Sequence, residues 1–269
     1  MTEKKLYGTV LVKSDVILEY LYGSDEPQGL ASISENTGLT KSTTLKILDT
    51  LEHIGYVIKN KKDRTYSIGF KLMKYSSKEM NQIDLAAKLD QYLEELHKKF
   101  DETVHLGVFK NNHIFTINKF QSSRPVVCSS SAIGETKELY SSGMGKAVLA
   151  ELDDHTLLNY INSNEFIPKT EKTIAGTQRL LAELEETRKR GYSVDNEENE
   201  EGVYCLGAAI TNTTDSGEKT VLGAFSISIP AFRATDDVLK QLVDAVLETK
   251  EIANASFNKK NWRNKHEKL

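Results

Sequence analysis

The sequence predicts an α+β fold built from two domains. The chain has 269 residues, close to twice the roughly 150 residues of a typical domain. Helical spacing of apolar residues dominates the first part, whereas strand-like alternation with interspersed helices follows. The charge changes at the same place in the chain. Residues 1–80 hold 12 Lys/Arg and 10 Asp/Glu, whereas residues 81–258 hold 18 Lys/Arg and 28 Asp/Glu. We therefore expect a mildly basic domain, residues 1–78, followed by an acidic domain, residues 79–258.

Composition restricts the class of protein. The net charge of −4 argues against a chain that binds nucleic acid along its whole length, and four prolines argue against long disordered linkers. The sequence contains neither a membrane-length apolar run nor a signal-peptide core. Two distant cysteines fit a reducing compartment. We expect a soluble cytoplasmic protein with no membrane partner and a disordered basic tail at residues 259–269.

Three helices are predicted in the first domain. They cover residues 14–22, 31–37 and 41–54, and the last two flank a short turn that begins at Gly38. Ser14 or Asp15 is expected to cap the first helix, and Thr40 the third. The third helix would bury Ile47, Leu48, Leu51 and Ile54. Two helices joined by so short a turn form a helix-turn-helix.

The exposed face of the third helix and the segment after it carry polar and basic groups. Segments 56–58 and 65–68 suggest a hairpin, or wing, with a basic tip. A helix-turn-helix followed by a basic hairpin is a specific order of elements, and its hydroxyls and lysines suit the base edges and phosphates of duplex DNA. The candidate contacts are Thr40, Lys41, Ser42, Thr43, Lys46, Lys59, Lys61, Lys62 and Arg64. A solvated turn or a plain dimerisation module remains the alternative.

The second domain is predicted to begin with an amphipathic helix at residues 79–100, which links it to the first. Elements after this linker helix alternate between strands and helices, as in sensory α+β domains. Strands are expected at 103–109, 114–120, 125–129, 203–211 and 221–229, and helices at 144–150, 154–163, 177–190 and 236–254.

A polar patch is predicted on the two later strands. Because side chains alternate along a strand, Cys205 and Gly207 share one face, as do Ala224, Ser226 and Ser228. A hairpin symmetric about its loop would pair Cys205 with Ser226, within a residue either way. A thiol and two hydroxyls beside small side chains indicate a concave binding spot. The alternative is that these residues only fill tight sheet positions.

Two other segments are candidate binding sites for a ligand or a metal ion. Gly143-Met144-Gly145 opens a helix and could present backbone N–H groups to a carboxylate or phosphate, although Ala147 and the missing upstream glycine exclude a Walker A loop. The acidic run 195–201 is expected to be a solvated loop rather than a metal site. The six histidines form no metal-binding motif. We predict no metal, no cofactor and no catalytic residue.

These residues together resemble the IclR family of bacterial transcription regulators, over about residues 9–255. The resemblance rests on motifs at residues 39–43, 51–57, 66–72, 143–150, 190–198, 202–205 and 226–228. It implies a winged helix-turn-helix joined to a GAF-like effector domain, a homodimer or homotetramer, and a palindromic operator. It also implies that a small carboxylic acid binds at Met144 and Gly145 (backbone), Asp195, Cys205, Ser226 and Ser228.

The chain departs from the family pattern at three places. Leu45 stands where many members carry a polar residue, and it could touch a thymine methyl group. Thr44 stands where an apolar residue is usual, and Ile229-Pro230 replaces a Ser-Gly-Pro ending. The operator sequence and the ligand size therefore do not carry over.

The sequence predicts a DNA-binding transcriptional regulator, with repression favoured over activation, whose operator affinity responds to a keto acid, sugar acid or aromatic acid. Two other hypotheses remain. In one, Cys205 is the nucleophile of a hydrolase-type enzyme, with His105 or His97 as its base. In the other, the chain is only an oligomerisation module.

Overall fold

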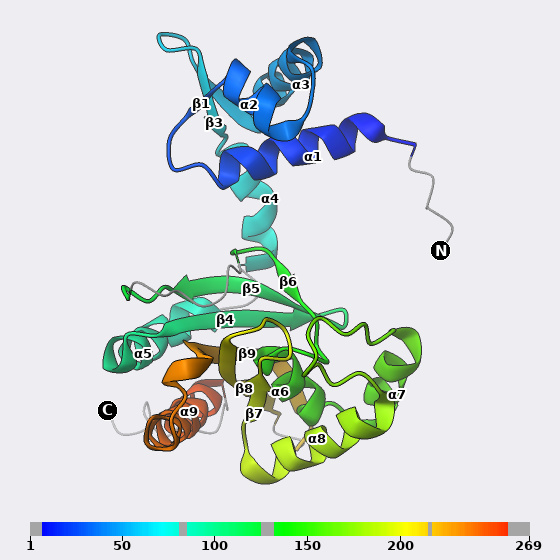
Figure 1. Ribbon diagram of the computed structural model, residues 1–269, viewed down its shortest axis with the longest axis vertical. Coiled ribbons are helices and arrows are strands. Elements are labelled where there is room, and N and C mark those ends of the chain that lie inside the picture. The colour runs from blue at the N-terminus through cyan, green and yellow to red at the C-terminus, as the bar shows by residue number, and fades with distance from the viewer. Residues whose placement is uncertain (1–6, 81–84, 125–131, 215–216, 258–269) are drawn as a thin grey trace. The chain divides into compact units, whose positions relative to one another are not determined.

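The computed structural model describes residues 7–80, 85–124, 132–214 and 217–257. The chain divides into two compact units, Met1–Gln82 and Ile83–Leu269, and both combine helices with strands (Figure 1). The predicted α+β class is confirmed. In the part that the structure describes, no helix is both long and apolar enough to cross a membrane. The predicted strand 125–129 and the basic tail 259–269 lie outside that part.

The first unit is a winged helix-turn-helix. Its strands form an antiparallel sheet in the order β1-β3-β2, in which β2 and β3 make the wing hairpin. Its elements are α1 (Thr9–Tyr22), β1 (Gln28–Gly29), α2 (Leu30–Thr37), α3 (Lys41–Ile54), β2 (Val57–Asn60), β3 (Thr65–Ile68) and α4 (Lys71–Met80).

Local chemistry sets the bounds of α2 and α3. Gly38 ends α2 and Gly55 ends α3 with φ of 67° and 83°, in the left-handed region that glycine adopts without strain. Thr40 caps α3, because its side chain accepts a hydrogen bond from the backbone N–H of Thr43. The apolar face of α3 packs into a core with α1, α2 and the wing, which includes Ile17, Ile33, Leu48, Val57 and Tyr66.

Two predicted helix bounds were wrong. Helix α1 begins at Thr9 with Gly8 as its N-cap, and Ser14 lies inside it, where its hydroxyl donates to the carbonyl oxygen of Val10. Its first turn carries exposed apolar residues, which a search for a buried face passes over. The single linker helix predicted at 79–100 is replaced by α4 and α5 (Leu85–Phe100), and residues 81–84 lie outside the described residues.

The second unit is an antiparallel sheet of six strands in the order β6-β5-β4-β9-β8-β7. The strands β6 and β7 were not predicted, because β6 has only two residues and β7 overlaps the acidic run 195–201 that was interpreted as a loop. The strands are β4 (Thr103–Lys110), β5 (His113–Phe120), β6 (Thr136–Lys137), β7 (Ser193–Asn196), β8 (Val203–Thr213) and β9 (Lys219–Pro230). The helices after α5 are α6 (Gly143–Glu151), α7 (Asp154–Ser163), α8 (Thr177–Arg190), the 3-10 turn η1 (Ala231–Arg233) and α9 (Asp236–Phe257).

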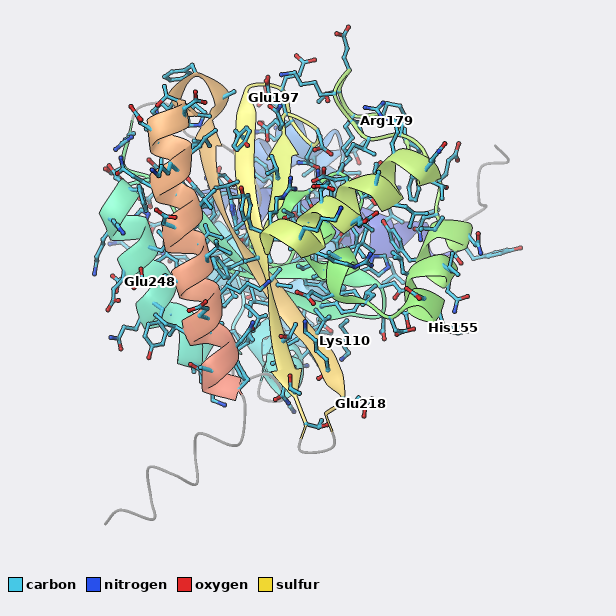
Figure 2. All side chains as sticks on the ribbon, turned by 90° about the horizontal axis from the view of Figure 1, so that it is seen from below. Lys110, His155, Arg179, Glu197, Glu218 and Glu248 are labelled. Atoms are coloured by element: carbon cyan, nitrogen blue, oxygen red, sulfur yellow. The ribbon has the colours of Figure 1, made fainter. Side chains whose placement is uncertain are left out.

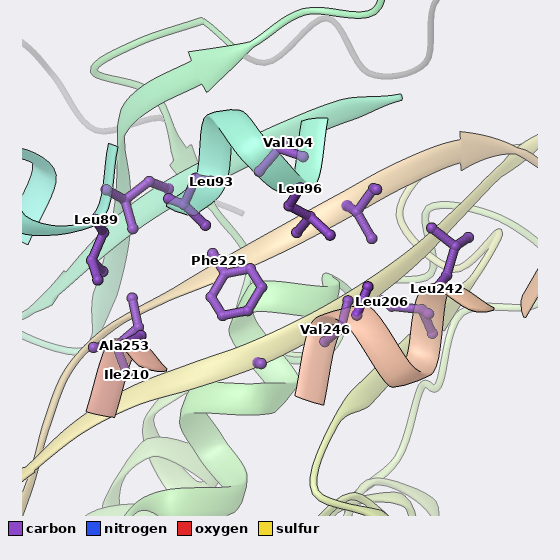
Figure 3. Close-up of a cluster of buried hydrophobic side chains, with 14 of the residues drawn as sticks. Leu89, Leu93, Leu96, Val104, Leu206, Ile210, Phe225, Leu242, Val246 and Ala253 are labelled. Atoms are coloured by element: carbon purple, nitrogen blue, oxygen red, sulfur yellow. The ribbon is translucent and has the colours of Figure 1, made fainter. Parts of the chain in front are cut away.

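Helices cover both faces of this sheet. Helices α5 and α9 pack on one face, where Leu89, Leu93, Phe225 and Val246 belong to one buried apolar cluster (Figure 3). Helices α6, α7 and α8 belong to a second cluster with residues of the other face, and Figure 2 shows the two helical layers on either side of the strands. Leu206 and Ile227 point to the first layer. Because side chains alternate, their neighbours along β8 and β9 face α6.

Candidate functional site

Two adjacent rows of the second sheet hold small and polar side chains on the face toward α6. The register aligns Asp195, Cys205, Ser228 and Thr103 across β7, β8, β9 and β4. The next row holds Ser193, Gly207, Ser226, His105 and Lys119, and extends to β5. The sheet register therefore brings together residues that lie more than a hundred positions apart in the sequence.

The predicted pairing of Cys205 with Ser226 was wrong. Cys205 lies opposite Ser228, and its Sγ donates a hydrogen bond to Ser228 Oγ at 3.1 Å, while Gly207 lies opposite Ser226. A register shift between Ile210 and Thr211 moves the pairing. Because the difference is an even number of residues, the thiol and both hydroxyls still share one face.

Helix α6 begins directly on β8. A Cβ added to Gly207 would lie 2.4 Å from the backbone of Gly143, so only glycine allows this approach. Ser193 Oγ holds the contact in place by donating to the carbonyl oxygens of Gly143 at 2.5 Å and Gly207 at 3.2 Å. The first backbone N–H groups of α6, which have no partner within the helix, therefore lie beside Cys205.

Gly145 is placed differently from the other predicted effector contacts. Its backbone N–H donates to the Oγ of Ser142, the N-cap residue, and a Cβ would lie 2.3 Å from Leu139. Its amide is thus already used, and Gly145 is absent from the lining of the cavity described next. The helix start itself lines that cavity with Ser142, Gly143 and Met144.

A cavity lies between the start of α6, the two polar rows and the loop after β7. Five predicted effector residues line it: Met144, Asp195, Cys205, Ser226 and Ser228. Seven others were not predicted as contacts, namely His105, Lys137, Ser142, Gly143, Asn199, Glu200 and Val203. About 30 Å³ is open to water centres, and one water needs at least about 10–15 Å³ on this measure. The space therefore suits a small ligand.

Asp195 is a buried carboxyl group that titrates near neutral pH. Its Oδ1 accepts hydrogen bonds from the backbone N–H groups of Glu198 at 2.8 Å and Asn199 at 3.3 Å. Burial raises the pKa of Asp195 to about 7, while the bond from Glu198 and the nearby Lys146 ammonium act in the opposite direction. Small changes in its surroundings will therefore decide whether this group is charged.

The acidic run 195–201 is not the solvated loop that was expected. Glu198 is buried together with Asp195, and its Oε1 forms an ion pair with the Nζ of Lys146, a side chain of α6 with no exposed surface. The hydroxyl of Thr173 donates to the backbone carbonyl of Glu198 at 2.6 Å. The run folds back as a wall of the cavity, and Lys146, the residue after the Gly-x-Gly motif, stabilises it through the ion pair with Glu198.

His105 is the other deeply buried titratable group in the cavity lining. Burial and the positive charges of Lys119 and Lys137 lower its pKa to about 3, so it is neutral at physiological pH. Within the part of the chain that the structure describes, its Nε2 has no hydrogen-bond partner. A base with this pKa cannot activate a thiol near pH 7, and His97 Nδ1 lies 2.8 Å from the carbonyl oxygen of Glu102. Neither histidine therefore supports the hydrolase hypothesis.

In the first unit, α3 presents a polar face outward. Lys41, Ser42, Leu45 and Lys46 are exposed, while Thr44 is fully buried and donates its hydroxyl to the carbonyl of Thr40 at 3.0 Å. Thr40 and Thr43 bond to one another at the helix start, so their hydroxyls already serve the cap.

The wing presents the remaining basic candidates. Lys61, Lys62 and Arg64 are exposed at its tip, where Asn60 Oδ1 accepts the backbone N–H of Lys62 and orders the turn. Lys59 lies lower on the hairpin, with its Nζ 5.2 Å from the centre of the Tyr66 ring. The tip therefore offers three solvated cations, and Lys59 is already engaged with an aromatic face.

Comparison with known proteins decides the family. Residues 77–253 match the family described as "Bacterial transcriptional regulator IclR C-terminal", and residues 10–60 match "IclR helix-turn-helix domain". The chain belongs to the IclR family. It is therefore a transcriptional regulator and not an enzyme, with a DNA-binding domain followed by a domain that binds small-molecule effectors.

Individual IclR-family relatives agree over most of the chain. The transcriptional regulator KdgR of Escherichia coli K12 is 31% identical over 227 residues, which cover 84% of both chains. The transcriptional repressor AllR of the same strain is 28% identical over 84% of this chain and 82% of its own. The crystal structure of Thermotoga maritima IclR aligns with a TM-score of 0.75 and 31% identity, covering 93% of this chain and 98% of that one.

Proposed function

We propose that this protein is a cytoplasmic repressor that binds a palindromic operator and leaves it when a small carboxylic acid occupies the cavity under α6. The observation that carries this proposal is the cavity itself. It combines backbone donors at a helix start with a thiol, hydroxyls and a buried carboxyl group in a space of a few water molecules. The repressive sign is supported by the resemblance to AllR, a transcriptional repressor.

Each polar group has a role in this proposal. The first N–H groups of α6, at Gly143 and Met144, receive the carboxylate, since a helix N-terminus favours negative charge. The hydroxyls of Ser226 and Ser228 donate to the remaining oxygens, Cys205 orients the Ser228 hydroxyl through its own hydrogen bond to it, and Asp195 meets a hydroxyl or hydrated carbonyl group of the acid. We exclude the N–H of Gly145 from this set, because Ser142 already accepts it.

The size of the cavity favours a keto acid or a short hydroxy acid among the three classes of acid considered. About 30 Å³ is open to water centres, room for a few waters, which favours short open-chain acids over a rigid aromatic ring. A sugar acid would need the wall at residues 195–201 to move.

DNA binding is assigned to the outward face of α3 and to the wing tip. Lys41, Ser42, Leu45 and Lys46 are placed to enter a major groove, and Lys61, Lys62 and Arg64 to contact phosphates beside it. Leu45 is 37% exposed, which leaves its methyl groups able to contact a thymine methyl.

Oligomer formation is supported by exposed apolar residues of the first unit. Val10 and Leu11 of α1 are 57% and 71% exposed, and Phe70 and Met73 at α4 are 77% and 64% exposed. Large exposed apolar groups mark contact surfaces. A homodimer that buries them would give the two-fold symmetry that a palindromic operator requires, and a homotetramer would pair two such dimers.

One mobility-shift experiment tests the whole proposal. The full chain is titrated onto the DNA upstream of its own gene, at two salt concentrations, with keto, sugar and aromatic acids in turn. We expect a shifted band that weakens with salt and is released by a small acid. Absence of a salt-sensitive band would contradict the DNA-binding assignment, release by no acid would contradict the effector assignment, and tighter binding with an acid would contradict repression.

A further inference from the structure

The effector cavity has a basic end that the family resemblance did not assign. The acidic and basic groups of the cavity lining lie at opposite edges of the sheet. Asp195 lies on β7 at one edge, and Lys137 lies on β6 at the other. Glu200, the other acidic group of the lining, lies on the loop between β7 and β8. An anion entering the cavity is therefore repelled from the β7 side and attracted toward the β6 side.

Lys137 supplies an available positive charge at this end. Its side chain lines the cavity, and no ion pair or hydrogen bond joins it to a residue in the described ranges. Lys119, which lies opposite His105 in the sheet register, adds a second positive charge on the same face. Both charges reach His105, since both lower the pKa of its imidazole.

His105 supplies the second observation. It is only 3% exposed, it lines the cavity, and its Nε2 has no partner among the described residues although buried polar atoms are nearly always bonded. A neutral imidazole offers one N–H donor and one acceptor. The Oγ of Ser226, directly opposite on β9, likewise makes no hydrogen bond to the residues that the structure describes. These unused groups point to a ligand atom that completes them.

We propose that His105 and Lys137 form a second anion-binding end of the cavity, so that the effector is a small acid with two carboxylates. One carboxylate lies at the start of α6. The other accepts a hydrogen bond from the His105 imidazole and pairs with the Lys137 ammonium. This inference rests on the proposed function, because it requires a carboxylic acid to occupy the same cavity.

The test compares acids of equal length that differ by one carboxylate. Malate is paired with 2-hydroxybutanoate, and malonate with propanoate, and each is titrated calorimetrically into the full-length protein. We expect each diacid to bind at least about tenfold more tightly than its partner, since a charge-assisted hydrogen bond is worth this factor or more. Equal affinities within both pairs would overturn the proposal.

Three variants show whether His105 and Lys137 cause the preference for the diacid. Lys137→Met and His105→Phe should each reduce the preference for the diacid, taken as the ratio of the diacid and monoacid affinities of the same variant, to less than about threefold. Lys240→Met removes the same charge from the exposed face of α9 and should keep the full preference. A preference that persists in both cavity variants would overturn the proposal, and so would its loss in Lys240→Met.

The outcomes also separate this inference from the proposed function. If monoacids and diacids bind equally and release the DNA, the acid-controlled repressor stands and only the second anion-binding end is wrong. If no acid of either kind binds, the proposed effector class fails and this inference fails with it. Melting temperatures of the two cavity variants, compared with that of the wild type, show whether a loss reflects unfolding.

Discussion

The two working surfaces of this regulator are built in opposite ways. The face of α3 consists of side chains from one helical segment, each exposed to solvent and arranged by the helical repeat alone. The cavity under α6, proposed as the effector site, collects buried groups from β4, β7, β8 and β9 and from the start of α6. The difference teaches that a substitution on the outward face of α3 alters one side chain without disturbing the fold, whereas the cavity depends on long-range packing.

The largest expected effect comes from the contact that seats α6 on β8. Gly207→Ala places a methyl group 2.4 Å from the Gly143 backbone, and such overpacking costs about 1–3 kcal/mol. We expect the free energy of unfolding of the second unit to fall by about that amount, as measured by chemical denaturation.

A graded control accompanies this variant. Gly143→Ala brings its Cβ to 3.3 Å from Cys205 Cβ, where a small shift relieves the contact. It should therefore cost clearly less than Gly207→Ala. Equal losses would show that close approach at Gly207 is not what limits the second unit.

Charge removal on the DNA-reading face should have the next largest effect. Lys46→Ala and Lys62→Ala should each weaken operator binding by roughly tenfold and lower the slope of log affinity against log salt by about one. Neither should alter acid binding, because both residues lie in the first unit. Lys240→Ala on α9 is the matched control, and an equal loss of DNA affinity there would show that the effect is only one of net charge.

A moderate effect is expected from pH on the cavity alone. Below its pKa of about 7 Asp195 is neutral, and above it the ionised carboxylate repels an acid in the same cavity. Affinity for the acid should therefore fall as pH rises through 7, by up to about tenfold per unit. Calorimetry at several pH values checks this, and Asp195→Asn should remove the dependence. A slope unchanged in Asp195→Asn would assign it to another group.

The smallest effect is expected inside the helix-turn-helix. Thr44→Val removes the hydroxyl that donates to the Thr40 carbonyl and keeps the buried shape. We expect a change in stability within about 1 kcal/mol and unchanged operator affinity, measured by thermal unfolding and by mobility shift. A loss of several kcal/mol would show that the buried hydroxyl matters as much here as polar groups do in the cavity.

Sequence reasoning succeeded best where signals are local. The bounds of α3, Gly38 at the end of α2, and the wing follow from spacing, capping and turn chemistry. It failed at the start of α1, where the apolar residues are exposed and so do not mark a buried face. It also failed for β6, which has only two residues, and for β7, whose second half lies in the acidic run that was interpreted as a loop.

Within the cavity, sequence reasoning reached the residue types but not their full arrangement. Alternation along β8 and β9 placed Cys205, Ser226 and Ser228 on one face, and the structure keeps them there. Their pairing was missed by two residues, because a register shift is set by packing. His105 and Lys137 were missed as cavity residues because nothing near them in sequence marks a site.

The sequence by itself determined the two-domain α+β plan, the helix-turn-helix and the face on which each strand residue lies. These depend on periods of 3.6 and 2 residues and on single turn-forming residues, which are properties of short segments. Only the tertiary structure decided which faces meet. It buried Asp195 and His105 in the lining of one cavity, and burial, which depends on every neighbouring element, sets the charge of each group and its availability to a ligand.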